Sequence, residues 1–155
     1  MPRLAVVWSL HALLALFLLS LAWPDPDKLY TPDSQGYDVL ATNLIAHQVF
    51  SVDSEDPFAP DAFRTPVYPL FLALCYVMFG HNPFVPVLIQ FALNLAIIRI
   101  AYRLGATLFD CEVGYWGSAL LALSGIFALH ARYLLTETLF TFLLASVIYW
   151  LVWLI

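Results

Sequence analysis

The sequence predicts an all-α polytopic membrane protein with about four transmembrane helices. Hydrophobic residues occupy 63% of the 155 positions and charged residues only 11%, whereas a soluble domain carries about 25% charged residues. Aromatic residues are frequent, at 16%, and Trp and Tyr are enriched at the interfaces of membrane helices. Several apolar runs approach the length of about 20 residues that a bilayer core requires. These observations indicate a multi-pass membrane protein.

Charge is unevenly distributed along the chain. Eight of the eleven acidic residues lie between Asp25 and Asp61, so one segment is strongly acidic and the rest is nearly neutral. The sequence contains no basic patch, and binding to nucleic acid is therefore not expected. The four histidines are scattered and the two cysteines lie far apart, so no metal site is predicted.

Residues 4–23 form the first predicted transmembrane helix, with about 20 apolar positions. Arg3 precedes this run, and basic residues favour the cytoplasmic side, so the N-terminus is expected in the cytoplasm. A cleaved signal peptide is the alternative, because Ser20-Leu21-Ala22 has the small-x-small form of a cleavage site. The apolar run exceeds the usual length of about 7–15 residues in such peptides, which favours a retained helix.

Residues 24–82 are expected to form an external loop that contains two helices. After Asp33, apolar residues recur at helical spacing and predict an amphipathic helix over 34–49. This helix would lie on the membrane surface or against other helices.

The second of these helices is predicted over 66–80, and its length argues against a membrane crossing. The segment after Pro69 reaches only about 18 Å at a rise of about 1.5 Å per residue. If it does not cross, Arg99 and Arg103 lie on the cytoplasmic side, which agrees better with the positive-inside rule.

Three more transmembrane helices are predicted over residues 83–104, 113–131 and 138–155. Gln90 and Asn94 lie four residues apart on one face of the first of these, and we expect them to hydrogen-bond between helices. Small residues in the second, such as Gly114, would let membrane helices approach closely.

This topology places four charged candidates on the external side: Asp33, Arg64, Arg132 and Glu137. Asp33 could cap a helix or act as a general base toward an acceptor hydroxyl or amine. Glu137 could stabilise the first turn of a helix or orient an acceptor or a cation. The two arginines could bind a lipid phosphate through their planar forks, or extend to the interface without a ligand.

Four blocks of the sequence, in their order and spacing, resemble the front part of bacterial GT-C membrane glycosyltransferases. The blocks are PDSQGYDVLATNLIAHQVFS, FRTPVYPLFLALCYVMFG, LIQFALNLAIIRIAYRLGATLF and LLTETLFTFLL. The chain is most similar to glycosyltransferase family 39 and its relatives, which are mannosyltransferase-like (dolichyl-phosphate-mannose-protein) and aminoarabinose-transferase-like. These enzymes are several times longer, so the resemblance implies that the chain is the N-terminal part of a longer protein and lacks much of the donor pocket.

The resemblance implies transfer of a sugar from a polyprenyl-phosphate-linked donor to a lipid, protein or glycan acceptor on the external or periplasmic side. The essential acid of the first external loop falls on Asp33, and a second acid falls on Glu137. Arg132 corresponds to an arginine that contacts the phosphate, and Arg64 and Tyr37 are assigned to the same lipid-phosphate or substrate site. The external acids could bind a divalent cation, but the sequence requires none.

Two other classes of protein remain open on the sequence alone. A transporter or lipid flippase would line a path across the bilayer with buried polar groups. A non-catalytic membrane subunit would use small residues for helix contacts and the acidic loop for a partner.

Overall fold

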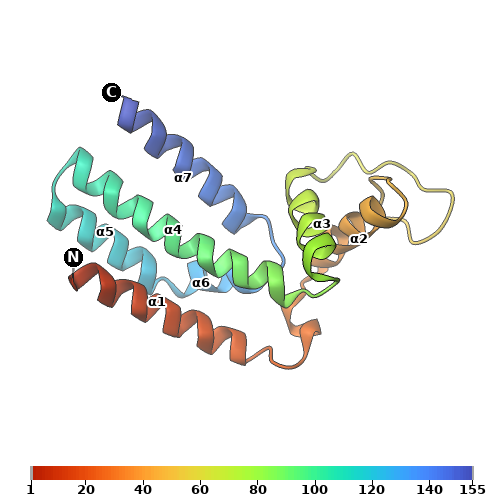
Figure 1. Cartoon of the computed structure of the whole chain (residues 1–155), viewed down its shortest axis with the longest axis horizontal. Helices are drawn as coiled ribbons and strands as arrows, with labels where there is room; N and C mark the ends of the chain where they lie inside the picture. The colour runs from red at the N-terminus through yellow and green to blue at the C-terminus, as the bar shows by residue number, and fades with distance from the viewer. Residues whose placement is uncertain (1, 155) are drawn as a thin grey trace.

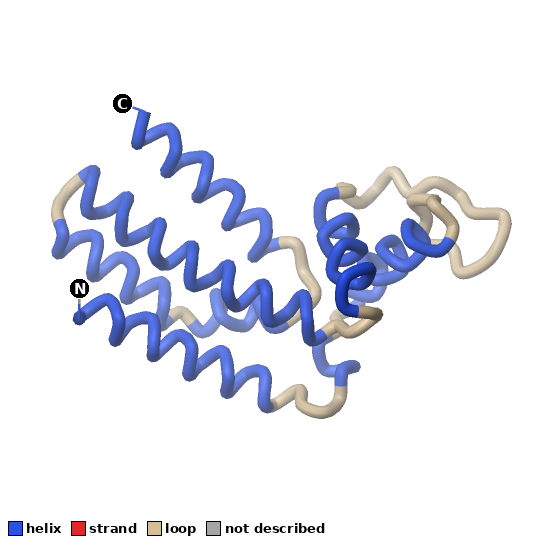
Figure 2. Tube along the Cα trace, in the orientation of Figure 1, coloured by secondary structure: helices blue, strands red, loops and turns tan. Residues whose placement is uncertain are grey.

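The computed structural model describes residues 2–154, and every regular element within this range is helical (Figure 2). The predicted all-α fold is therefore confirmed. In chain order the elements are α1 (Pro2–Ser20), the short 3-10 helix η1 (Pro26–Leu29), α2 (Pro32–Ala46), α3 (Val67–Phe79), α4 (Phe84–Leu108), α5 (Cys111–Leu123), α6 (Gly125–Arg132) and α7 (Glu137–Leu154). The helix predicted over 138–155 corresponds to α7, and residue 155 lies outside the described range.

Helices α1, α4, α5 and α7 run alongside one another in a bundle, and α2 and α3 pack together at one end of it (Figure 1). Three of the described helices, α1, α4 and α7, are long and apolar enough to cross a membrane, and the pair α5–α6 makes a fourth if it is one span. These helices indicate a membrane protein. With 13 residues, α3 is only about 20 Å long, against a bilayer core of about 30 Å.

The first helix is an integral part of the bundle. Val7 and Ala15 are buried against other helices, and the His11 side chain is fully buried. This helix is also long and apolar enough to cross a membrane.

The helix predicted over 113–131 is not continuous, which corrects the sequence prediction. It breaks at Ser124, whose backbone is extended (φ −67°, ψ 109°), and α5 and α6 meet at an angle of 54°. The Ser124 hydroxyl caps α6 by accepting a hydrogen bond from the Phe127 N–H, at 3.4 Å. Adjacent serine and glycine are a recognised cause of sharp helix kinks, and here Gly125 follows the serine directly.

Buried polar side chains of the bundle face the backbone carbonyls near this break. His11 Nδ1 lies 2.9 Å from the carbonyl oxygen of Ala122, and Asn94 Nδ2 donates to the carbonyl of Phe127 at 3.1 Å. Gln90 donates to two carbonyls at and after the end of α6. A broken helix leaves carbonyls that an apolar surrounding cannot satisfy. The prediction that Gln90 and Asn94 hydrogen-bond between helices is thus confirmed, and both side-chain amide nitrogens donate to backbone carbonyls.

The amphipathic helix predicted over 34–49 is present as α2 but begins and ends earlier. Its N-cap is Thr31, whose hydroxyl accepts from the Ser34 N–H at 3.3 Å, and Pro32 occupies the first turn. The suggestion that Asp33 is the cap is therefore wrong, since Asp33 lies inside the first turn. A carboxylate in that position still interacts favourably with the helix dipole.

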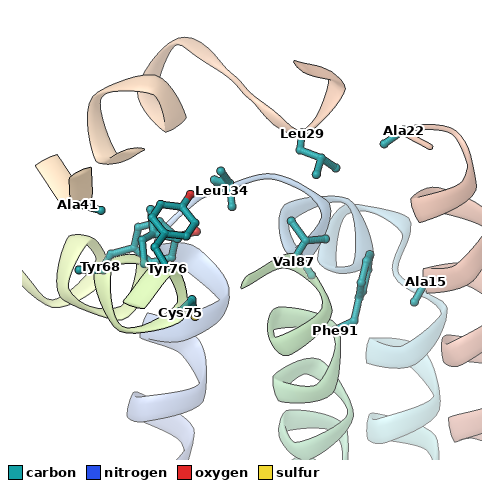
Figure 3. Packing of buried hydrophobic residues seen from close by; sticks show 13 residues of the cluster. Ala15, Ala22, Leu29, Ala41, Tyr68, Cys75, Tyr76, Val87, Phe91 and Leu134 are labelled. Carbon is teal, nitrogen blue, oxygen red and sulfur yellow. The ribbon is translucent and has the colours of Figure 1, made fainter. Parts of the chain in front are cut away.

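A cluster of buried apolar side chains fixes α2 and α3 to the bundle. It includes residues of α3, of η1 and of the segment between α6 and α7, among them Tyr68, Leu29 and Leu134, each 0–1% exposed. Figure 3 shows this cluster, with Tyr68 and Tyr76 of α3 and Leu134 among its members. Leu134 also donates its backbone N–H to the carbonyl of Leu29 at 3.2 Å. The start of α7 is therefore held against the unit that carries α2.

The two ends of the bundle differ in charge. Arg3 on α1 and two arginines on α4 lie at the end away from α2 and α3, where Asp110 and Glu112 are the only acidic residues. The remaining nine acidic residues and three basic residues lie at the end that carries α2 and α3.

Candidate functional site

The two candidate acids, Asp33 and Glu137, both influence the pKa of Tyr37. Asp33 and Tyr37 lie one turn apart on α2, and Glu137 begins α7. Burial raises the pKa of Tyr37, the charge of Arg64 lowers it, and the carboxylates of Asp33 and Glu137 raise it further. Both carboxylates are therefore close enough to disfavour a phenolate at Tyr37. Helix α2 and the start of α7 lie at the same end of the bundle (Figure 1).

Arg64 is held over α2 by a set of defined contacts. Its guanidinium carbon Cζ lies 5.7 Å from the centre of the Tyr37 ring, and its Nη1 pairs with Oδ2 of Asp61 at 3.2 Å. Gly36 makes this position possible, because a Cβ on that residue would lie 2.5 Å from Cζ of Arg64. The arginine therefore rests on a surface that only glycine provides.

The Asp61 carboxylate, which pairs with Arg64, is itself held by backbone hydrogen bonds. Its Oδ1 accepts the backbone N–H groups of Phe63 and Arg64 at 2.7 and 3.0 Å. The hydrogen bond from the Arg64 backbone is the largest of the effects that lower the pKa of Asp61. A carboxylate that stays ionised keeps the Arg64 side chain in place before any ligand arrives.

Arg132 differs from Arg64 because its charge is uncompensated. It ends α6, and its Cζ lies 5.5 Å from the centre of the Tyr133 ring. Its Nε is buried and has no hydrogen-bond partner, and no carboxylate pairs with it among residues 2–154. A buried donor without an acceptor is costly, so this guanidinium is suited to bind an anionic ligand.

The sequence analysis missed a second polar cluster on α2, centred on Asp38. The hydroxyl of Tyr76 donates to Oδ1 of Asp38 at 2.5 Å, and His81 Nε2 lies 3.1 Å from the same oxygen. Burial and Asp38 raise the pKa of Tyr76, and burial is also the largest of the effects that raise the pKa of Tyr30. The available signal was a carboxylate on the predicted amphipathic helix, with Tyr and His in the next apolar segment and just after it.

No group of three or more His, Cys, Asp or Glu in the described part of the chain is placed to hold a metal ion. The arrangement offers two exposed carboxylates, Asp33 and Glu137, one partly buried phenol, Tyr37, and two arginines. One arginine is fixed by an ion pair and the other is unpaired. Such a set can bind a phosphate and take a proton from a nucleophile.

Comparison with known proteins gives no match to any family model, curated protein or solved structure. The resemblance to GT-C glycosyltransferases therefore depends on the four sequence blocks.

Proposed function

We propose that the chain forms the front part of a membrane glycosyltransferase of the GT-C type. It would bind a polyprenyl-phosphate-linked sugar at the end of the bundle that carries α2 and α3, and would take part in transfer of the sugar to a lipid, protein or glycan acceptor. The observation that carries this proposal is the placement of Arg64 over the Tyr37 ring, at the end of the bundle where α2 and the start of α7 lie.

In the proposed reaction Asp33 is the general base. It takes the proton from an acceptor hydroxyl or amine while the acceptor attacks the anomeric carbon. The bond from that carbon to the phosphate oxygen breaks, and the polyprenyl phosphate leaves with its negative charge. The attack is in line with the leaving group, so the configuration of the sugar is inverted.

The arginines would stabilise the leaving phosphate. Arg132 has a free guanidinium and an unpaired buried Nε for this purpose, whereas Arg64 is oriented by Asp61. A well-placed donor to developing charge contributes roughly 10²–10³-fold in rate. Glu137 would orient the acceptor, and Tyr37 would present a protonated hydroxyl to the sugar or the phosphate.

The distribution of charge supports one orientation of the chain in the membrane. Basic residues near span ends favour the cytoplasmic side. The end with Arg3, Arg99 and Arg103 would therefore face the cytoplasm of a cell (inner or plasma) membrane, and the acidic end would face outward. A polyprenyl-linked sugar presented on the outer leaflet would then meet Asp33.

The test is label transfer in proteoliposomes that contain the full chain and a radiolabelled polyprenyl-phosphate sugar. Label is counted in the lipid, protein and glycan fractions. Asp33→Asn should reduce transfer at least 100-fold, whereas Asp27→Asn, an exposed acid of η1, should leave it unchanged. Equal rates of transfer in wild type and Asp33→Asn would show that Asp33 is not the general base.

Binding of the lipid phosphate provides a second measurement, which does not require turnover. A photoreactive polyprenyl phosphate should crosslink to the wild-type chain, and Arg132→Gln should reduce the yield about tenfold. A wild-type chain that neither transfers sugar nor crosslinks to the lipid phosphate would reject the proposal and favour a non-catalytic subunit.

A further inference from the structure

A cavity of about 560 Å³ lies between α1, α4 and α5, at the end of the bundle away from Asp33. Its lining includes Arg3, Arg99, Arg103, Trp8 and Tyr115. It is separate from the proposed transfer site, and nothing in that proposal uses it.

The cavity carries excess positive charge. Arg3 pairs with Glu112 at 2.9 Å, but both side chains are 65–70% exposed, and exposed pairs contribute little to stability. Arg99 and Arg103 have no carboxylate within ion-pair distance in the described part of the chain. They lie four residues apart on one face of α4, where like charges repel each other. An anion in the cavity would relieve this repulsion.

Aromatic rings and a free donor complete the polar part of the cavity. Arg99 Cζ lies 5.6 Å from the centre of the Trp8 ring, and Arg3 Cζ lies 5.9 Å from that of Tyr115. The indole Nε1 of Trp8 is buried and has no hydrogen-bond partner among the described residues. The cavity therefore offers guanidinium groups held beside aromatic rings, and its lining includes a tryptophan whose indole N–H has no partner.

The remainder of the surface is apolar and identifies the kind of anion. Leu4 and Ala5 line the cavity, and further along α1 the side chains of Val6, Leu10 and Leu13 are 45–62% exposed. A free phosphate would use only the arginines. A phospholipid would also cover the apolar wall with its acyl chains, and basic pockets between membrane helices are suited to anionic headgroups.

We infer that this cavity binds the phosphate of an anionic glycerophospholipid in the leaflet opposite the acidic end of the molecule. The same two arginines of α4 also line a smaller cavity of about 170 Å³ beside Tyr149 of α7. A headgroup held by Arg99 and Arg103 would therefore lie between α1 and α7, and would hold both helices against α4.

Native mass spectrometry of the full chain, purified in a neutral detergent, tests this inference. Phosphatidylglycerol and phosphatidylcholine with the same acyl chains are added at equal concentration. The wild-type chain should retain phosphatidylglycerol at a concentration at least tenfold lower than phosphatidylcholine. Arg99→Gln and Arg103→Gln should each reduce this preference about fivefold, which corresponds to about 1 kcal/mol per basic residue.

Two further variants control for charge and for folding. Lys28→Gln removes an exposed positive charge at the opposite end and should leave the preference unchanged. Glu112→Gln removes the competing carboxylate and should strengthen phosphatidylglycerol binding, so the inference stays testable even if the arginine variants do not fold. Equal retention of the two lipids by the wild-type chain would overturn it, as would an equal loss in Lys28→Gln. Displacement of the lipid by millimolar inorganic phosphate would show a site for free anions and would also overturn it.

Discussion

Tyr68 of α3 donates a hydrogen bond of 2.6 Å to Oε1 of Gln90 on α4, and both side chains are at most 1% exposed. Nε2 of the same glutamine donates to the carbonyls of Ala131 and Tyr133, at 2.9 and 2.8 Å. One amide thus joins α3, α4 and the segment between α6 and α7. That segment leads directly to Glu137, so Gln90 helps to set where the second acid lies.

Gln90→Leu should destabilise the protein by about 1–3 kcal/mol, because the Tyr68 hydroxyl and two carbonyls lose their partner in an apolar surrounding. The free energy of unfolding in mixed detergent micelles measures this loss. Leu88→Ala, on the exposed side of α4, is the control and should cost much less. A Gln90→Leu variant as stable as Leu88→Ala would show that this junction does not hold α3 to the bundle.

Gly36→Ala separates stability from function at the proposed site. A methyl group there would lie 2.5 Å from Arg64 Cζ, so the guanidinium must move, and a flexible side chain can do so cheaply. Alanine is also the better helix former, by about 0.5–1 kcal/mol. Thermal stability should therefore stay equal or rise.

Transfer or lipid-phosphate crosslinking should nevertheless fall about 10- to 100-fold in Gly36→Ala, because misplacement of a positioning group by about 1 Å can have effects of that size. Gln35→Ala, at an exposed neighbouring position of α2, should change neither property. Unchanged crosslinking in Gly36→Ala would show that Arg64 does not take part in binding the lipid phosphate.

The sequence predicted the helices well because their length and apolar content are local properties. It also indicated that Gln90 and Asn94 hydrogen-bond between helices, since a polar group in an apolar helix needs a partner. It did not predict that the partners are carbonyls near the break at Ser124. Mean hydropathy is the same for a straight and a bent span, and only the Ser124-Gly125 pair hinted at the bend.

The candidate site could be predicted only in part, for the same reason. Asp33 and Glu137 stand out because each lies near the start of a predicted helix. The role of Asp38 depends on Tyr76 and His81, which lie 38 and 43 residues further along the chain. No local pattern reports such a contact, and the close approach of Arg64 to α2 depends on packing in the same way.

Stability should decrease as the pH rises above about 10, the ordinary pKa of tyrosine. Burial and the Asp38 carboxylate raise the pKa of Tyr76, and Tyr30 is shifted in the same direction. Above pH 10 the unfolded chain releases these protons while the native protein retains them, so each further pH unit favours unfolding. Below pH 10 both states are protonated and this contribution is constant.

Tyr76→Phe tests the origin of that slope. At neutral pH the variant should be less stable by about 1.5–3 kcal/mol, since a hydrogen bond to a charged group is lost. Above pH 10 its stability should fall less steeply than that of wild type, as measured by unfolding at a series of pH values. Parallel pH curves for the two proteins would assign the alkaline transition to other groups.

The contact between α4 and α5 leads to the last prediction, because it has no room for a side chain. A Cβ on Gly114 would lie 2.6 Å from the carbonyl oxygen of Tyr102, and one on Gly105 would lie 2.6 Å from Cα of Gly114. These neighbours are backbone atoms, which cannot move aside as a side chain can. Gly114→Ala should therefore force the helices apart and destabilise the protein by about 1–3 kcal/mol, the usual cost of overpacking.

Gly117→Ala, on the same helix, is the matched control, because nothing lies within 4 Å of a Cβ at that position. It should be neutral or slightly stabilising, so the two variants differ in packing while they share the same change in helix propensity. Since Tyr102 also lines the cavity with Arg99 and Arg103, Gly114→Ala should weaken the preference for phosphatidylglycerol as well, and Gly117→Ala should not. If both variants unfold at the same temperature, α4 and α5 do not approach closely at these glycines. The cavity between α1, α4 and α5 would then not be lined as described here.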